Sequence, residues 1–394
     1  MRISKRVASL TASATLAISA KAKAMKAAGR SVIDFGAGEP DFPTPKHICE
    51  AAKRAIDEGF TRYCPASGMP ELRAGIAARF KADCSLEYAP SEVLVSVGGK
   101  EAIYNVVQAL VDDGDEVVIP APYWLSYPEM VRAAGGVPVG VEAGPASDFK
   151  ITPRQLAGAI TEKTALFIFN SPCNPTGAVY SPDEVRALFK VIEERSIPAI
   201  SDEMYDKLVY GGTRCLSPAS ISPRLKELVF TSNGVSKTYA MTGWRVGYIA
   251  GPRDAIEAAG SLQSHSTSGT CSIAQKAALA ALAGPQESVE RMRLEFDRRR
   301  LRMLERLNAI PGVRCPEPKG AFYCFPDVSD RFGGSVGGRN VADSVSFCAA
   351  ALDLAEVALV PGEPFGGANH VRLSYSTSME NIEEGLARLA RLMR

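Results

Sequence analysis

The chain has 394 residues, of which 46% are hydrophobic and 23% are charged, a composition typical of a folded protein large enough for more than one core. Its 45 Lys and Arg residues balance 44 Asp and Glu residues, so the net charge of +1 provides no basic field for nucleic acid. These values argue against a disordered chain, a collagen and a membrane bundle, and we expect neither DNA nor RNA as a partner.

The cysteines and the first twenty residues bear on the cellular compartment. The nine cysteines form no C-x-x-C pair and have no histidine at zinc-ligand spacing, so we expect reduced thiols. Residues 1–20 loosely imitate a signal peptide, but five Ser and Thr residues interrupt the apolar stretch. Nowhere does the chain approach the ~18 consecutive apolar residues of a membrane span. We therefore expect a cytoplasmic protein with no membrane partner.

Residues 46–284 alternate helical periodicity with short apolar runs, which predicts an α/β domain with a mainly parallel sheet covered on both faces. Residues 101–110 are predicted to form a helix, because their apolar side chains share one face. The nearly continuous apolar runs are those expected of buried strands. The predicted strands are residues 93–97, 116–119, 165–169, 198–201, 228–231 and 246–250.

After residue 284 the pattern changes to a long charged helix with one apolar stripe, whose arginines we expect on the solvated side. The sequence beyond it predicts a smaller α/β domain, and the glycine-rich residues 333–338 are expected to form a surface loop. We therefore divide the chain into an N-terminal segment (1–45) that packs with the small domain, a large domain (46–284) and a small domain (285–394). The last domain is predicted to contain strands 321–325, 357–360 and 370–374 and helices 340–354 and 379–392.

The segment 232–245 is the most informative part of the sequence, because it follows a predicted strand and places Lys237 eight residues before Arg245. Open α/β sheets bind ligands beyond the carboxyl ends of their strands, which is where Lys237 is expected. A lysine forms a Schiff base readily when it is partly desolvated and near other cations. Arg245, together with Ser236 and the backbone around Gly234, could hold a phosphate beside it.

Three further segments place polar groups where strands end or a helix begins. Asp202 ends another predicted strand and is followed by Tyr205, whereas Asn174 lies in a rigid turn after a strand. Gly99 and Lys100 open a predicted helix, whose N-terminal amides suit an anion. Each of these residues, taken alone, also fits an ordinary structural role as a helix cap, a turn residue or an exposed lysine.

Together these segments resemble the class I aminotransferases of pyridoxal phosphate fold type I, in particular the bacterial aspartate aminotransferases. The resemblance runs nearly from end to end. It implies a large domain with a mainly parallel, doubly covered sheet and a smaller α/β domain, pyridoxal 5′-phosphate as the cofactor, and no metal. It also implies transfer of an amino group from aspartate or another amino acid to 2-oxoglutarate. Further matching segments are residues 37–42, 63–68, 122–124, 320–323 and 370–375.

The resemblance implies three catalytic residues, Lys237, Asp202 and Tyr205. Lys237 is expected to form the Schiff base with the cofactor aldehyde. Asp202 is expected to pair with the pyridine nitrogen, which keeps that nitrogen protonated so that the ring can accept electrons. Tyr205 and Asn174 are expected to hydrogen-bond the ring 3-oxygen, and Trp124 to stack on the ring face.

The resemblance also implies how the cofactor phosphate is bound. The main-chain amides of Gly99 and Lys100 are expected to contact it, together with Ser236 and Arg245. Tyr63 is expected to reach the same phosphate from a second subunit. A homodimer with shared active sites is therefore expected, because the implied role of Tyr63 requires a partner subunit.

For the substrate, the resemblance implies that Arg372 binds the α-carboxylate, since its planar fork can make two parallel hydrogen bonds that a lysine cannot. The backbone of Gly38 is expected beside the same carboxylate. Trp124 and Asn174, which are expected at the cofactor ring, are also expected to line the place where the substrate binds.

The side-chain carboxylate of an acidic substrate needs a second cation, because Arg372 can serve only one carboxylate. In the bacterial branch that the chain resembles, a lysine and a threonine take this role, and Lys100 and Thr15 occupy their positions. Relatives that also accept prephenate carry a lysine where this chain has Thr11. We therefore expect a preference for aspartate and glutamate, and weak use of prephenate.

The residues leave three alternatives open, because one fold supports several reactions. The first is an aminotransferase of broader specificity that takes aromatic amino acids or prephenate. The second is a pyridoxal phosphate-dependent β-lyase. The third and least favoured is a non-catalytic regulator that binds the cofactor, since such regulators carry a DNA-binding domain ahead of the fold and only about 30 residues are expected ahead of the fold here.

Overall fold

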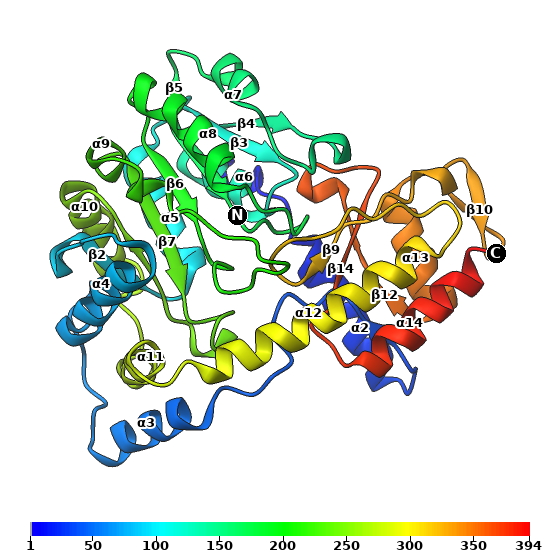
Figure 1. The fold of residues 1–394 in the computed structure, drawn as a ribbon, viewed down its shortest axis with the longest axis horizontal. Helices are drawn as coiled ribbons and strands as arrows, with labels where there is room; N and C mark the ends of the chain where they lie inside the picture. The colour runs from blue at the N-terminus through cyan, green and yellow to red at the C-terminus, as the bar shows by residue number, and fades with distance from the viewer. Residues whose placement is uncertain (1) are drawn as a thin grey trace.

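The computed structural model describes residues 2–394, and its largest element is a seven-stranded sheet (Figure 1). The strand order is β2-β8-β7-β6-β5-β3-β4, and every neighbouring pair is parallel except the two pairs that include β8. The predicted α/β class is confirmed. The strands are β2 (Val93–Ser96), β3 (Glu116–Ala121), β4 (Val137–Glu142), β5 (Thr164–Asn170), β6 (Ala199–Asp202), β7 (Val229–Gly234) and β8 (Gly247–Ala250).

The sequence did not predict β4, which is one of the two edge strands. Val137 is 48% exposed, and Val141 is the only buried residue of β4, so the segment lacks the continuous apolar run of its neighbours. Pro138 and Gly140 also interrupt it, and both residue types are tolerated at a sheet edge. The other edge strand, β2, was predicted, because all four of its residues are buried and form an apolar run like those of the inner strands.

Helices cover both faces of this sheet, because successive side chains of a strand point to opposite faces. On one face, Val95 and Phe167 belong to a cluster shared with α3, α4, α7, α8, α9 and α11. On the other face, Leu94 and Ile168 belong to a cluster shared with α5, α6 and α10. The helices are α3 (Lys46–Asp57), α4 (Pro70–Cys84), α5 (Gly99–Leu110), α6 (Ser126–Ala134), α7 (Pro153–Ala159), α8 (Pro182–Arg195), α9 (Pro223–Lys226), α10 (Arg253–Ser264) and α11 (Ser272–Ala283).

The long helix α12 (Glu287–Asn308) extends from the part of the molecule that holds the large sheet to the C-terminal part (Figure 1). Its predicted apolar stripe is buried. The expectation that its arginines are solvated is wrong at two positions, because Arg299 and Arg300 are buried as well. Each is paired there, Arg299 with Asp41 at 2.8 Å and Arg300 with Glu317 at 2.7 Å, so neither charge is buried alone.

The C-terminal part contains a three-stranded antiparallel sheet of order β13-β14-β9. The N-terminal segment joins this part, because β1 pairs in parallel with β12. The division of the chain after residues 45 and 284 stays a prediction. The elements are α1 (Lys5–Ala8), α2 (Ala14–Ala27), β1 (Ile33–Asp34), β9 (Tyr323–Cys324), α13 (Ser344–Ala355), β12 (Val357–Ala358), β13 (Val360–Pro361), β14 (Val371–Ser374) and α14 (Met379–Leu392).

The glycine-rich stretch that was expected to be a loop is a β-hairpin, formed by β10 (Gly334–Val336) and β11 (Arg339–Val341). Gly337 and Gly338 connect the two strands, and their φ angles are +56° and +79°. A two-residue hairpin turn with positive φ at both positions suits glycine and matches the twist of the strands. The stretch is mostly exposed, as expected, but it forms a hairpin with a two-glycine turn and not a loop.

None of the helices formed by residues 2–394 combines the length and the apolar character that crossing a membrane requires.

Candidate active site

The carboxyl ends of β5, β6 and β7 lie side by side, because the parallel register pairs Asn170 with Asp202 and Asp202 with Ser232. The segments that follow these strands carry Asn174, Asp202 and Lys237. Sequence positions far apart therefore meet at one edge of the sheet, as was expected for a ligand site in an open α/β fold.

Lys237 is largely buried, and its Nζ donates a hydrogen bond to the carbonyl oxygen of Gly38 at 2.6 Å. Burial lowers the pKa of Lys237 from 10.5 to about 8, and the cations Arg245 and Arg372 act in the same direction, whereas Glu39 opposes them. Taking an ammonium group out of water disfavours its charge. The amine is therefore neutral, and so nucleophilic, much closer to neutral pH than that of an ordinary lysine.

Asp202, at the end of β6, is only 6% exposed. Its Oδ2 accepts a hydrogen bond from the Tyr127 hydroxyl at 2.6 Å, and its Oδ1 accepts one from the Met204 amide at 3.1 Å. Burial raises the pKa of Asp202, and these hydrogen bonds and the charge of Lys237 oppose that rise. A buried carboxylate in this position is suited to a cationic partner.

Tyr127 was not predicted as a site residue. It lies one helical turn after Trp124, and its ring packs edge-on against that of Trp124 with centroids 5.3 Å apart. The only sequence signal was this spacing, which is also typical of aromatic residues in a core. Trp124 itself is half-buried near the start of α6, and the Nζ of Lys100 lies 4.9 Å from the centre of its ring.

Arg372, on β14, is only 2% exposed and joins the two parts of the molecule at the site. Its Nη1 donates to Asn174 Oδ1 and its Nη2 donates to the Gly36 carbonyl, both at 2.9 Å. Its Nε is buried without a partner. A buried donor without a partner is costly, so this guanidinium has capacity for a further acceptor. Gly38, expected beside the substrate carboxylate, contacts Lys237 through its carbonyl oxygen.

The hydroxyl of Tyr205 lies 3.0 Å from that of Tyr323, and both side chains are buried. Tyr323 is a second residue whose role the sequence did not reveal, although its segment was among those that carried the resemblance. Tyr205, Asn174 and Arg372 were predicted to lie together, and the contacts among Tyr205, Tyr323, Arg372 and Asn174 bring them into one cluster.

The N-terminus of α5 forms the second half of the site. Gly98 precedes the helix with a φ of +88°, and a side chain there would collide with Arg245, since a Cβ would lie 2.4 Å from its Nη2. Burial lowers the pKa of Lys100, as does the neighbouring Arg245. Free amides and two cations at one helix end have the chemistry that suits an anion, and Ser236 lies buried on the segment that carries Arg245.

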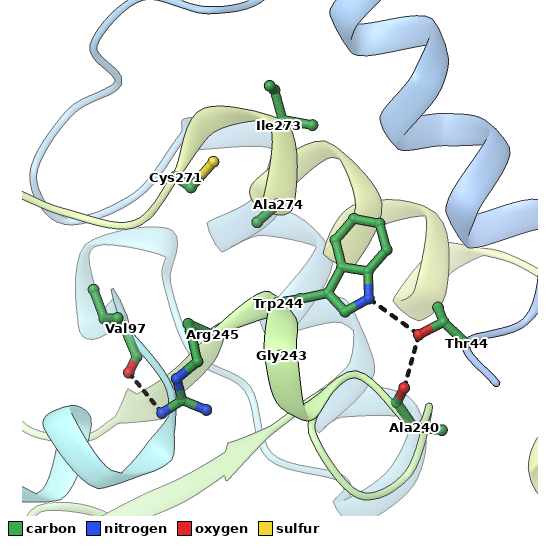
Figure 2. A pocket seen from close by; sticks show the side chains of 9 residues that line it. All are labelled: Thr44, Val97, Ala240, Gly243, Trp244, Arg245, Cys271, Ile273 and Ala274. Carbon is green, nitrogen blue, oxygen red and sulfur yellow. Dashed lines mark hydrogen bonds between the residues drawn. The ribbon is translucent and has the colours of Figure 1, made fainter. Parts of the chain in front are cut away.

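A pocket of about 600 Å³ borders this anion site, and Figure 2 shows how its wall holds Arg245 in place. Arg245 donates to the carbonyl oxygens of Val97 at 3.1 Å and Thr242 at 2.9 Å. Trp244 Nε1 donates to Thr44 Oγ1 at 3.0 Å (Figure 2). Of the predicted site residues, Arg245 alone lines this pocket, so the pocket is distinct from the place where Lys237 and Asp202 lie.

Two predicted site residues, Tyr63 and Thr15, form no side-chain hydrogen bond with the residues around Lys237 and Arg372. Tyr63 is 97% exposed, as a residue that serves another subunit would be in a single chain. Thr15, in the first turn of α2, has a buried Oγ1 without a hydrogen-bond partner. No metal-binding group of three or more His, Cys, Asp or Glu side chains occurs among residues 2–394.

Comparison with known proteins places this site in a family. The sequence model of the family described as "Aminotransferase class I and II" matches residues 30–389. The aspartate aminotransferase of Geobacillus stearothermophilus is 52% identical over 393 residues, which cover 100% of this chain and 99% of that protein. The aspartate/prephenate aminotransferase of Cereibacter sphaeroides is 49% identical over 389 residues, which cover 98% of this chain and 97% of that protein.

Solved structures agree over the whole chain. The aspartate aminotransferase of Rhizobium meliloti superposes with a TM-score of 0.96 at 42% identity, covering 100% of this chain and 99% of that one. The aspartate aminotransferase of Thermus thermophilus with maleate has a TM-score of 0.94 at 43% identity and covers 100% of both chains.

Proposed function

This chain belongs to the class I and II aminotransferase family, and we propose that it transfers the amino group of aspartate, or of a similar amino acid, to 2-oxoglutarate. The protein is a transaminase, and its cofactor is pyridoxal phosphate. The observation that carries the proposal is the convergence of Lys237, Asp202 and Arg372 at one edge of the large sheet. A Schiff-base lysine, a carboxylate for a ring cation and a carboxylate-binding arginine are the groups that this chemistry needs.

The residues present fit the cofactor. Lys237 is a buried amine with a lowered pKa, which suits reaction with an aldehyde. Asp202 is a buried carboxylate whose pKa is raised by burial, which suits a protonated ring nitrogen as its partner. The amides at the start of α5, with Arg245 and Ser236, suit the phosphate. We propose that Asn174 and Tyr205 hydrogen-bond the ring 3-oxygen and that Trp124 stacks on the ring.

When bound, pyridoxal phosphate supplies an aldehyde that receives the amino group and a ring that accepts the electron pair left at the substrate Cα. Lys237 Nζ removes the proton from the substrate Cα and later returns a proton, acting first as base and then as acid. Asp202 maintains a negative charge opposite the ring nitrogen, and the Tyr127 hydroxyl fixes its orientation. Arg372 orients the substrate through its α-carboxylate.

We propose that Lys100 and Thr15 recognise the side-chain carboxylate of an acidic substrate. Lys100 Nζ lies over the ring of Trp124, which is expected to stack on the cofactor, at 4.9 Å from the ring centre. The buried, unpartnered Oγ1 of Thr15 provides a donor that a bound carboxylate would satisfy. Relatives are named both as aspartate and as aspartate/prephenate aminotransferases. Since Thr11 replaces the lysine expected for prephenate, we propose that prephenate is a weak substrate.

We also propose a homodimer in which Tyr63 completes the phosphate site of the partner subunit. Its support is the nearly complete exposure of Tyr63 in a single chain. A reducing compartment, the cytoplasm, is proposed because all nine cysteines are free thiols.

A half-reaction tests the proposed function directly. The cofactor-loaded protein is mixed with aspartate, freed of excess amino acid by gel filtration, and then given 2-oxoglutarate. We expect oxaloacetate in the first step and one glutamate per active site in the second. A β-lyase or a non-catalytic regulator releases no glutamate in the second step, and that result would refute the proposal.

A further inference from the structure

Tyr323 lies where the cofactor-binding and the substrate-binding parts of the proposed site meet. It is on β9, opposite Ser374 of β14 in the antiparallel register, so Arg372 is its diagonal neighbour on the same face of the sheet. Diagonal neighbours across two strands are within reach of aromatic and long side chains. Tyr323 is 1% exposed, so its contacts are fixed by packing on all sides.

The ring of Tyr323 supports the guanidinium of Arg372. The Cζ of Arg372 lies 4.5 Å from the centre of the Tyr323 ring and 5.1 Å from the centre of the Phe365 ring. A cation over an aromatic face is stabilised, and more so where both are desolvated. With its two Nη atoms bonded to Asn174 and Gly36, the guanidinium has little freedom left to rotate out of the plane in which it would meet a carboxylate.

The hydroxyl of Tyr323 contacts the other side of the site. It lies 3.0 Å from the hydroxyl of Tyr205, and a Cβ on Gly38 would lie 3.3 Å from it. Tyr205 has a single hydroxyl proton, which it can donate either to Tyr323 or to a bound cofactor. Burial raises the pKa of Tyr205 and of Tyr323, so both hydroxyls keep their protons.

We propose that Tyr323 is a positioning residue with two functions: its ring fixes the plane of Arg372, and its hydroxyl donates to Tyr205 so that the Tyr205 proton is directed at the cofactor. The inference rests on the proposed function, in which Arg372 binds the α-carboxylate and Tyr205 contacts the ring 3-oxygen. Hydrogen bonds in a chain strengthen one another, so the donation from Tyr323 makes Tyr205 a better donor.

The variant Tyr323→Phe tests the hydroxyl, because it keeps the ring. Weaker donation from Tyr205 leaves more negative charge on the ring 3-oxygen, so the visible absorption band of the bound cofactor should titrate at higher pH. We expect a rise of at most about 0.7 of a pKa unit, since a neutral hydrogen bond contributes ~1 kcal/mol and one unit is ~1.4 kcal/mol. Tyr375→Phe is the control: it removes another buried hydroxyl, 3.2 Å from the Ala321 carbonyl, and should leave the band unchanged.

The variant Tyr323→Leu tests the ring. We expect the dissociation constant of succinate, a dicarboxylate that cannot react, to rise on the order of tenfold with Leu but to stay within about twofold of the parent with Phe. The binding is read from the absorption change at equilibrium, so it does not depend on turnover. Steady-state kinetics should agree: we expect KM to rise in Tyr323→Leu and to change little in Tyr323→Phe.

The titration of Tyr323→Phe and the succinate binding of Tyr323→Leu can be distinguished from a failure of the proposed function. If the parent protein binds no cofactor or passes no amino group to 2-oxoglutarate, the proposed function is wrong. If the parent is active but the cofactor band of Tyr323→Phe titrates at the same pH as that of the parent, or at a lower pH, Tyr323 does not donate to Tyr205. Equal succinate binding by the Leu variant and the parent would show that the ring does not position Arg372.

Discussion

The environment of Lys237 determines when its amine can react. Its charged form is disfavoured by burial and by Arg245 and Arg372, whereas Glu39, hydrogen-bonded to Thr242 at 2.7 Å, favours that charge. These opposing influences leave the pKa at about 8, below the 10.5 of an ordinary lysine. The reactive neutral amine therefore accumulates as the pH rises through about 8.

We therefore predict that the cofactor-free protein takes up pyridoxal phosphate at a rate that rises with pH and levels off above about pH 8. Stopped-flow absorbance measures this rate. Glu39→Gln removes the carboxylate that favours the ammonium form, so it should move the curve to lower pH. A rate that still increases between pH 9 and 10.5 would mean that the amine titrates like an exposed lysine, contrary to the account.

Lys100 has two separable parts, a main-chain amide at the start of α5 and a side chain over Trp124. Lys100→Ala keeps the amide and removes the cation. We predict that kcat/KM falls for aspartate and glutamate by roughly one to two orders of magnitude, since a charge-assisted hydrogen bond contributes ~1.5–3 kcal/mol. Neutral and aromatic amino acids should change little. An equal fall in kcat/KM for both classes of substrate would show that the Lys100 side chain does not recognise the side-chain carboxylate of the substrate.

At the scale of elements, the site depends on how closely β8 approaches the start of α5. A Cβ on Gly247 would lie 2.1 Å from the Gly99 amide nitrogen and 2.4 Å from the Gly98 carbonyl carbon. No rotation of a side chain can relieve a contact with backbone. The first turn of α5, which presents its amides to the proposed phosphate site, is therefore positioned by the absence of a side chain on the neighbouring strand.

Gly247→Ala should displace this helix start, reduce the free energy of unfolding by ~1–3 kcal/mol, and weaken cofactor binding. Urea unfolding and equilibrium cofactor titration measure the two effects. Gly158→Ala is the matched control, because Gly158 lies in α7 with no atom within 4 Å of the added Cβ. It should be neutral or stabilising by up to ~1 kcal/mol. Unchanged cofactor affinity in Gly247→Ala would show that the close approach of Gly247 to α5 does not position the proposed phosphate site.

The sequence predicted those elements whose burial is continuous, such as β5 and β6, because their side chains form unbroken apolar runs. It missed β4 because an exposed edge strand has no such run, and it missed the hairpin at Gly337 because glycine signals loops and tight turns alike. Lys237 could be singled out by its position after a predicted strand, but its specific role, like that of Arg372, came only from motifs of the resembled family. Tyr127 and Tyr323 could not, since a buried tyrosine that bonds a site residue has the same local pattern as one in a core.

The whole molecule is proposed to work as a dimer, and Tyr63 provides the test. Tyr63→Ala and Lys237→Ala chains are each expected to form impaired homodimers. In a hybrid of the two, the site with an intact Lys237 receives Tyr63 from the other chain, so one of two sites is restored. Differently tagged chains isolate the hybrid, whose activity should be about half that of the parent dimer. Sedimentation velocity should give twice the chain mass.

A hybrid no more active than its two parent homodimers would show that Tyr63 does not act across an interface. A monomeric parent protein would have the same consequence. In either case the proposed roles of Lys237 and Arg372 would stand, because both residues lie within one chain.

Reductive trapping identifies the amine that carries the cofactor, which we propose is that of Lys237. The cofactor-loaded protein is reduced with borohydride and digested, and the peptides are mapped by mass spectrometry. We expect one phosphopyridoxyl group per chain, attached to Lys237, and no attachment when Lys237 is replaced by Ala. Stoichiometric attachment to any other lysine, or equal labelling of the Lys237→Ala variant, would contradict this proposal.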